Sequence, residues 1–131
     1  MKISHSISKE NLGPVIEAVI ENSFDSIMVT ATDDESGSTP IVFVNEAFTA
    51  LTGYTVDEVL GKSPSLLQGP DTDPVIIERL RKDLEDGRVF QGSTINYRKD
   101  GVPFTMDWRV APVVRADGGP KYHIAVQRND G

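Results

Sequence analysis

The sequence predicts an α+β fold, an antiparallel sheet with short helices gathered on one face. Five short segments have the alternating or apolar pattern of strands, and turn residues bound them. Between the second and third of these segments, residues 45–87 have the start and stop signals of several short helices. The chain has 131 residues, which fits one domain that can bury a core of its own.

Residues 9–23 are expected to form the first element, a helix, because apolar residues recur at helical spacing. They are Leu12, Val15, Ile16, Val19 and Ile20. Ser8 is a suitable N-cap, whereas Gly13-Pro14 weakens the first turns. We therefore expect residues 1–24 to be a flanking helix and residues 25–131 to be the core domain.

Two short strands are expected next, at residues 26–30 and 41–44. The intervening sequence DDESGSTP is a cluster of turn residues, so the pair suggests a hairpin.

The following helices are predicted from their caps. Asn45 can cap EAFTALT, which Gly53 would close, and Thr55 to Glu58 fits a capping box that Gly61 ends. Ser63-Pro64 has the pattern of an N-cap followed by the first helical residue. Asp73-Pro74 repeats this pattern before a longer helix that ends at Gly87. Its expected apolar face consists of Val75, Ile76, Leu80 and Leu84.

Three strands complete the predicted fold. Residues 93–98 lead into the hairpin turn Lys99-Asp-Gly101, and residues 104–113 alternate in hydrophobicity. One face of that strand carries Phe104, Met106, Trp108 and Val110. A turn is expected at residues 116–119, before a last strand at 122–127. That strand presents Tyr122, Ile124 and Val126 on one face and His123, Ala125 and Gln127 on the other. A sheet with helices on one face forms a natural small-molecule pocket between the two.

Composition excludes several classes of function. The net charge of −7 and pI of about 4.7 argue against binding to nucleic acid or to an anionic membrane surface. The chain has no cysteine, which excludes disulfides, thiolate metal sites and a cysteine nucleophile. No apolar run is long enough to span a membrane, and the N-terminus lacks the apolar core of a secretory signal. We expect a cytoplasmic protein.

Nothing in the sequence indicates an enzyme. The carboxylates Asp71 and Asp73 fit turn and cap roles, and residues 33–35 fit an exposed turn. The two histidines, His5 and His123, lie in no pattern typical of a catalytic triad. No metal-ligand cluster, phosphate-binding loop or dinucleotide-binding motif is visible.

The central stretch IVFVNEAFTALTGYTVDEVLGKS resembles PAS domains. LLQGPDTDP, NYRKDGVPF and VQRND resemble the light-oxygen-voltage (LOV) branch of that superfamily, which binds FMN. The resemblance covers about residues 24 to 130. It implies a five-stranded antiparallel PAS fold with an N-terminal flanking helix, and a sensory role in signal transduction.

In LOV domains, blue light drives a covalent bond between a cysteine and the flavin C4a atom. The family segment usually reads GRNCRFLQ, and here residues 61–68 read GKSPSLLQ. The cysteine position is therefore Pro64. The neighbouring asparagine position is Ser63, and the phosphate-binding arginine position is Ser65. The resemblance thus implies a LOV-type domain that forms no cysteinyl adduct, because no thiol is present.

Other family positions are retained. Gln68 matches the glutamine of the motif, Arg81 the second phosphate-binding arginine, and Asn96 the first asparagine at the flavin's pyrimidine edge. The second such asparagine is Met106 here. Gln127 matches the glutamine near flavin N5 and O4, whose hydrogen-bond rearrangement is thought to carry the signal in this family. Each retained residue also has a plain structural reading, as a helix-surface, loop or strand polar group.

Three functions remain open at this stage. The favoured one is a LOV-type sensory domain that relays a signal to an effector outside this chain. A second is a cysteine-less light or redox sensor that binds FMN or riboflavin. A third is a ligand-free module that forms a homodimer through residues 9–23 and the outer sheet face, in which that helix covers Tyr122, Ile124 and Val126 in the same chain or in a second copy.

Overall fold

The computed structural model describes residues 8–32, 36–113 and 121–131. The expectations for His5, for the turn at residues 33–35 and for the turn at residues 116–119 lie outside these residues. Within them the elements are α1 (Lys9–Glu21), β1 (Ser26–Thr32), β2 (Ile41–Val44), α2 (Glu46–Thr52), α3 (Val56–Val59), the 3-10 helix η1 (Pro64–Leu67), α4 (Pro74–Glu85), β3 (Phe90–Tyr97), β4 (Pro103–Val113) and β5 (Lys121–Asn129).

The strands form one antiparallel sheet in the order β2-β1-β5-β4-β3. The hairpin of β1 and β2 is confirmed, with Met28 opposite Val44. The last strand in the sequence, β5, pairs with β1 and with β4. The strands that come first and last in the sequence are therefore neighbours within the sheet. Strand β3 begins three residues earlier than expected, because Phe90 already pairs with Val110. The α+β class and the five-stranded sheet are confirmed.

The predicted caps begin and end the short helices as expected. Asn45 accepts a hydrogen bond from the backbone N–H of Phe48, and Gly53 ends α2 with a left-handed φ of 81°. The capping box of Thr55 and Glu58 is present at the start of α3. These signals are local in sequence, which is why they could be identified without knowledge of the fold.

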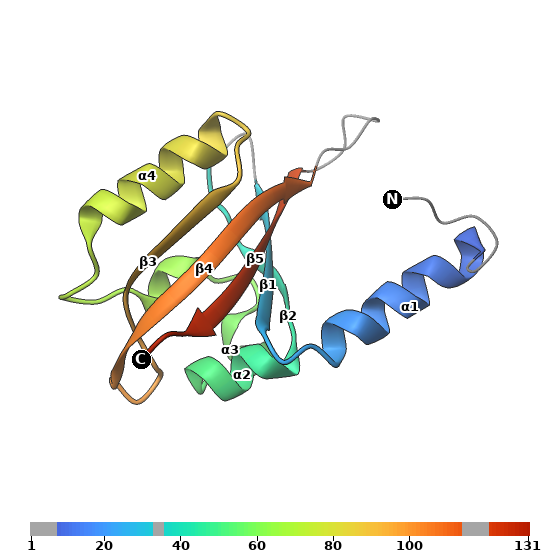
Figure 1. The fold of residues 1–131 in the computed structure, drawn as a ribbon, viewed down its shortest axis with the longest axis horizontal. Coiled ribbons are helices and arrows are strands. Elements are labelled where there is room, and N and C mark those ends of the chain that lie inside the picture. Colours follow the sequence, from blue (N-terminus) through green and yellow to red (C-terminus); the bar gives the residue numbers. More distant parts are fainter. Residues whose placement is uncertain (1–7, 33–35, 114–120) are drawn as a thin grey trace.

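Helices α2, α3, η1 and α4 cover one face of the sheet (Figure 1). The core lies between these helices and that face, and the alternation predicted for β4 is confirmed. The buried apolar residues are Met28, Ile41, Val44, Phe48, Val59, Leu67, Phe90, Phe104, Met106, Trp108, Val110 and Ala125. Ile76, Ile77, Leu80 and Leu84 of α4 pack against this cluster.

The apolar face predicted for α4 was wrong at one residue. Val75 is 71% exposed, and Ile77 packs against the core instead. At about 100° per residue, Val75 lies almost opposite Ile77 around the helix. Val75 therefore faces solvent beside the N-cap Asp73, whose side chain accepts a hydrogen bond from its backbone N–H.

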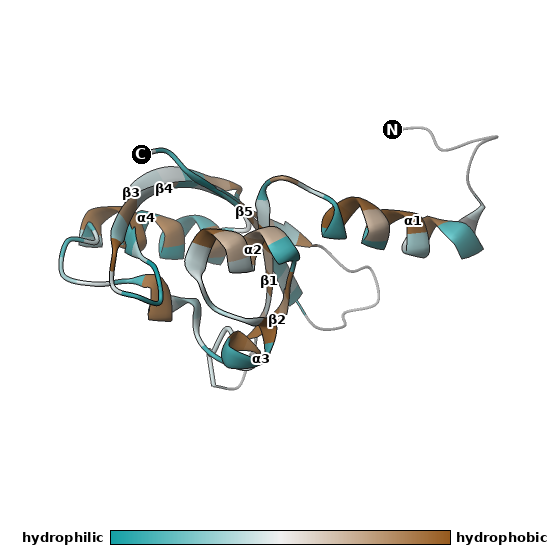
Figure 2. Ribbon diagram, turned by 90° about the horizontal axis from the view of Figure 1, so that it is seen from below, coloured by the Kyte–Doolittle hydropathy of each residue, from teal (hydrophilic) through white to brown (hydrophobic). Residues whose placement is uncertain are grey.

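Helix α1 extends away from the sheet (Figure 1). Figure 2 shows hydrophobic residues along this helix, and its most exposed large apolar side chain is Val19, at 65%. Val15 and Ile16 are exposed beside it. The C-terminal end of α1 is held to the core, where the Asn45 side-chain amide donates to the carbonyl of Ile20 at 2.9 Å. None of the described helices is both long and apolar enough to cross a membrane.

Candidate ligand pocket

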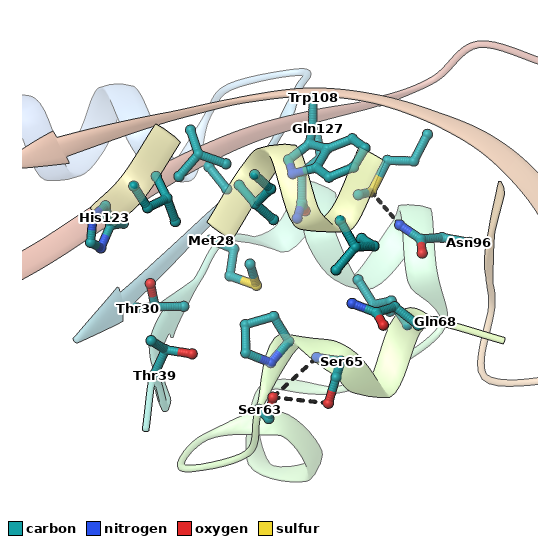
Figure 3. A pocket seen from close by; sticks show the side chains of 18 residues that line it. Met28, Thr30, Thr39, Ser63, Ser65, Gln68, Asn96, Trp108, His123 and Gln127 are labelled. Atoms are coloured by element: carbon teal, nitrogen blue, oxygen red, sulfur yellow. Dashed lines mark hydrogen bonds between the residues drawn. The ribbon is translucent and has the colours of Figure 1, made fainter. Parts of the chain in front are cut away.

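A pocket lies between the inner face of the sheet and the helices η1 and α4 (Figure 3). Its volume is about 200 Å³. The wall consists of Met28, Thr30, Thr39, Ser63, Pro64, Ser65, Leu67, Gln68, Ile77, Leu80, Leu84, Asn96, Met106, Trp108, Val110, His123, Ala125 and Gln127. This set contains no Lys, Arg, Asp or Glu, although a quarter of the chain is charged. The pocket is thus apolar with a few polar groups, as is typical of small-molecule sites.

Gln127 is the most deeply buried polar residue of the wall, with 1% of its surface exposed. Strand β5 directs it inward, and β1 provides its partner: Ser26 Oγ donates to Gln127 Oε1 at 2.8 Å. Ser26 and Gln127 are also a cross-strand pair. No hydrogen bond holds the Gln127 side-chain nitrogen to a described residue, so this amide has donors available for a ligand.

Asn96 is buried in the wall on β3, close to Met106 on β4. Its amide has two alternative orientations. In one, its nitrogen lies 3.4 Å from Met106 Sδ; in the other, the nitrogen donates to the carbonyl of Leu67 at 3.1 Å. The second orientation is better satisfied, because a carbonyl oxygen is a stronger acceptor than a thioether. The thioether of Met106 is therefore only a weak hydrogen-bond acceptor for Asn96. Met106 also has no amide that could bind a ligand.

The η1 segment supplies the remaining predicted residues of the wall. Pro64 is partly buried and forms the first residue of η1, with Ser63 as its N-cap. Ser63 and Ser65 are exposed and pair with each other, since their hydroxyl oxygens are 2.9 Å apart. Gln68, at the end of η1, is exposed at the rim. Seven of the eight sequence-predicted residues thus line one pocket.

Arg81 is the exception. It lies on the exposed surface of α4, outside the pocket wall, and its guanidinium forms ion pairs with Glu78 and Glu85. These carboxylates raise the pKa of Arg81 above its usual range. To bind a ligand phosphate, Arg81 would have to give up both partners. Its sequence match alone does not bring it to the site.

The motif LQGPDTD has a structural role that the sequence reading did not identify. Residues 69–73 dock on β3: Thr72 Oγ1 donates to the carbonyl of Ile95 at 2.7 Å, and the Asp73 N–H donates to Thr94 Oγ1 at 2.8 Å. Gly69 lies so close to Tyr97 that a Cβ atom there would be 2.3 Å from the ring. This docking fixes Gln68 and Asn96 in the same wall.

Three polar residues of the wall were missed as site residues: Thr30, Thr39 and His123. Thr30 and His123 are a cross-strand pair, 7% and 9% exposed. His123 Nδ1 is buried and has no hydrogen-bond partner among the described residues. Burial lowers the pKa of His123, and the charge of Lys121 lowers it further. The alternation along β5 placed His123 and Gln127 on the same face of the strand, so the sequence contained a signal for His123 as a site residue.

Comparison with known proteins agrees with this fold and pocket. The family model described as "PAS domain" matches residues 25–129. The chain therefore belongs to the PAS domain family. It is 37% identical over 101 residues to blue-light-activated histidine kinase 1 of Erythrobacter litoralis, covering 77% of this chain and 28% of that protein. The matched region is thus only about a quarter of that relative.

Two solved structures identify the branch of the family. One, described as "Flavin Analogue Sheds Light on Light-Oxygen-Voltage Domain Mechanism", has a TM-score of 0.79 and 31% identity, over 93% of this chain and 88% of that one. The other is the LOV domain from the Erythrobacter litoralis EL346 blue-light activated histidine kinase, with a TM-score of 0.74 and 30% identity, over 82% and 96%. The chain is a PAS domain of the LOV type, a sensory module.

The residues of the pocket fit the flavin ring of FMN, the cofactor of the LOV family, better than its phosphate. The amides of Gln68, Asn96 and Gln127 offer donors and acceptors that suit the polar edge of a flavin ring, and the apolar side chains between them suit its faces. Among the described residues of the wall there is no cation for the phosphate of FMN. The volume, about 200 Å³, also lies below the roughly 300–1,000 Å³ of common ligand sites. The residues fit an uncharged ring system and do not fit the phosphate.

Proposed function

We propose that this domain is a LOV-type sensor that works without a cysteinyl-flavin adduct and relays the state of an uncharged, flavin-like ligand to an effector outside this chain. The observation that carries the proposal is the buried Gln127 amide in a pocket wall whose described residues are all uncharged. Pro64 occupies the family's cysteine position, and the chain contains no cysteine. A bound flavin would supply light absorption and redox chemistry.

The wall residues have distinct roles in this proposal. Gln127 and Asn96 hydrogen-bond the polar edge of the ring, while Trp108, Leu80 and other apolar side chains exclude water from its faces. Pro64 fills the wall without a reactive group. An uncharged wall would hold riboflavin in preference to FMN, because a phosphate brought to it would lack a charged partner.

A chain of hydrogen bonds supports relay from the pocket to α1. Gln127 accepts from Ser26 on β1 at 2.8 Å. The next residue, Ile27, donates through its N–H to Asn45 Oδ1, also at 2.8 Å. The Asn45 nitrogen in turn donates to the carbonyls of Ile20 in α1 and of Asp25, at 2.9 and 3.0 Å. If the ligand changes which atoms it offers to Gln127, the amide must rotate, and Ser26 loses its acceptor.

The test is to change Gln127 to Leu and record the absorption spectrum of the riboflavin-bound protein. We expect the flavin bands to shift, because a hydrogen bond to the ring is lost. Gln91→Leu, on the exposed side of β3, is the matched control and should leave the spectrum unchanged. A Gln127→Leu spectrum identical to that of the wild type would remove Gln127 from the site.

A second function, homodimerisation, is favoured by the exposed apolar face of α1. Val15, Ile16 and Val19 have no covering partner within the described chain, and α1 does not lie on the outer face of β5. A second copy would cover this face, as isologous dimers do. Sedimentation of the Ile16→Glu, Val19→Glu double variant should give a monomer where the wild type gives a dimer. Val75→Glu, on exposed α4, is the control; an unchanged double variant would exclude α1 as the interface.

A further inference from the structure

The pocket has polar groups at two separate ends (Figure 3). Asn96 and Gln68 lie at one end, and Gln127 lies between the ends. His123, Thr30 and Thr39 lie together at the other end. Apolar side chains, including Met28, separate these groups. The first end is accounted for by the proposed flavin-like ligand, and the second is not.

The second end carries an unsatisfied group. His123 is more than nine-tenths buried, and its Nδ1 has no hydrogen-bond partner among the described residues. A buried polar atom without a partner costs stability, so it favours any ligand that supplies one. A neutral imidazole offers one donor and one acceptor, and the hydroxyls of Thr30 and Thr39 can do both. A ligand that carries either a hydrogen-bond donor or an acceptor is therefore suited to this end of the pocket.

An ordinary flavin does not match this end. Its ring has the polar pyrimidine edge on one side and two methyl groups on the benzenoid side. If Asn96 and Gln127 take the polar edge, methyl groups would face His123 and leave it unpaired. A ring system with a hydrogen-bonding group in place of a methyl would pair both ends.

We propose that His123, with Thr30 and Thr39, forms a second polar subsite that selects an uncharged fused heteroaromatic ligand with hydrogen-bonding groups at both ends. This inference rests on the proposed function, because it concerns the same pocket. It assigns specificity to the chain's own residues. Asn96 recognises one end of the ligand, His123 recognises the other, and Gln127 binds between them. Specificity of this kind arises because a ligand without the polar group leaves the site's buried group unpaired.

The test compares two probes that differ only at the benzenoid end: riboflavin, with a methyl group at ring position 8, and 8-amino-8-demethylriboflavin, with an amino group of similar size. Fluorescence titration of the full chain should show the amino analogue binding about tenfold more tightly, the gain of one hydrogen bond in a buried site. His123→Phe keeps an aromatic ring and should abolish or reverse that preference. Tyr122→Phe, on the opposite face of β5, should retain it.

A second readout is independent of affinity. The ¹⁵N resonances of the His123 ring should shift on addition of the amino analogue and stay unchanged with riboflavin. Equal binding of both probes to the wild type, or a preference that survives in His123→Phe, overturns the subsite while the proposed function stands. Failure of both probes to bind the wild type overturns the flavin-like ligand and the subsite together.

Discussion

Ser26 and Gln127 are joined across strands β1 and β5 by a buried hydrogen bond of 2.8 Å from the serine hydroxyl to the glutamine side-chain oxygen. The two residues are separated by 101 positions in the sequence. They pair because β1 and β5, the first and last strands in the sequence, are neighbours in the sheet. The bond fixes the orientation of the Gln127 amide, and with it the donors that the amide presents to the pocket.

Removal of this bond should destabilise the domain. Ser26→Ala leaves Gln127 Oε1 buried without its donor, which costs about 1–3 kcal/mol of unfolding free energy. Urea denaturation measures this loss. Ser38→Ala, at an exposed serine, should change the unfolding free energy by less than about 0.5 kcal/mol. Equal effects of the two variants would show that the Ser26–Gln127 bond contributes nothing specific.

The contact between Gly69 and Tyr97 should be intolerant of a methyl group. Gly69→Ala would place a Cβ atom 2.3 Å from the Tyr97 ring, so the ring or the loop must move. We expect a loss of about 1–3 kcal/mol in unfolding free energy, together with weaker ligand binding, because this loop positions Gln68. Gly13→Ala, which has open space in α1, is the control and should be neutral or slightly stabilising. A Gly69→Ala protein as stable as the wild type would contradict the tight docking of this loop.

Protonation of His123 should make the domain less stable at mildly acidic pH. Burial lowers the folded-state pKa of His123 below its ordinary value of 6.5. The unfolded chain therefore binds the proton at a higher pH than the folded chain, and stability falls as the pH drops through 6.5. For one proton the slope is at most about 1.4 kcal/mol per pH unit.

Urea midpoints measured between about pH 7.5 and about pH 5 would test this titration, with His123→Phe as the comparison. The variant should show a shallower decline, since it lacks the buried imidazole. Glu58, whose pKa is lowered to about 2 mainly by its hydrogen bond to Lys99, is present in both proteins, so the slope that it adds near pH 5 cancels in the comparison. Identical pH profiles for the two proteins would contradict a role for His123.

A cysteine at position 64 should restore the chemistry of the LOV family. Pro64 lines the pocket, so Pro64→Cys would place a thiol beside the proposed ligand. With riboflavin bound, blue light should then bring about a reversible loss of the flavin's visible absorption. The thiol would add across the C4a–N5 double bond of the ring, with its sulfur on C4a and its proton on N5. The wild type and Val75→Cys, an exposed cysteine on α4, should show no such loss. Failure of Pro64→Cys to respond while flavin is bound would mean that position 64 does not face the reactive carbon.

Local signals predicted most of the fold. The caps Asn45, Ser63 and Asp73 act within three residues of themselves, and the alternation along β4 reports its buried face directly. Val75 was misassigned because three consecutive apolar residues at the start of α4, Val75, Ile76 and Ile77, fit two overlapping helical faces, and only packing decides between them.

The site was predicted less completely. The family motif located Gln68, Asn96 and Gln127. Arg81 was assigned to the site from the family match, although the spacing of Glu78 and Glu85, three residues before it and four after it on a helix, is typical of ion pairs. The pairing of Thr30 with His123 depends on the register between the first and last strands, which are remote in sequence. Contacts of this kind follow from topology, so local periodicity does not reveal them.

The central claim is that an uncharged pocket binds an uncharged flavin-like ring. Parallel fluorescence titrations of the wild-type chain with riboflavin and with FMN test it most directly. We predict that riboflavin binds about tenfold or more tightly than FMN, because burial of a phosphate without a cation is unfavourable. Tighter binding of FMN would contradict the account, since it would mean that Arg81 leaves its carboxylates to hold the phosphate.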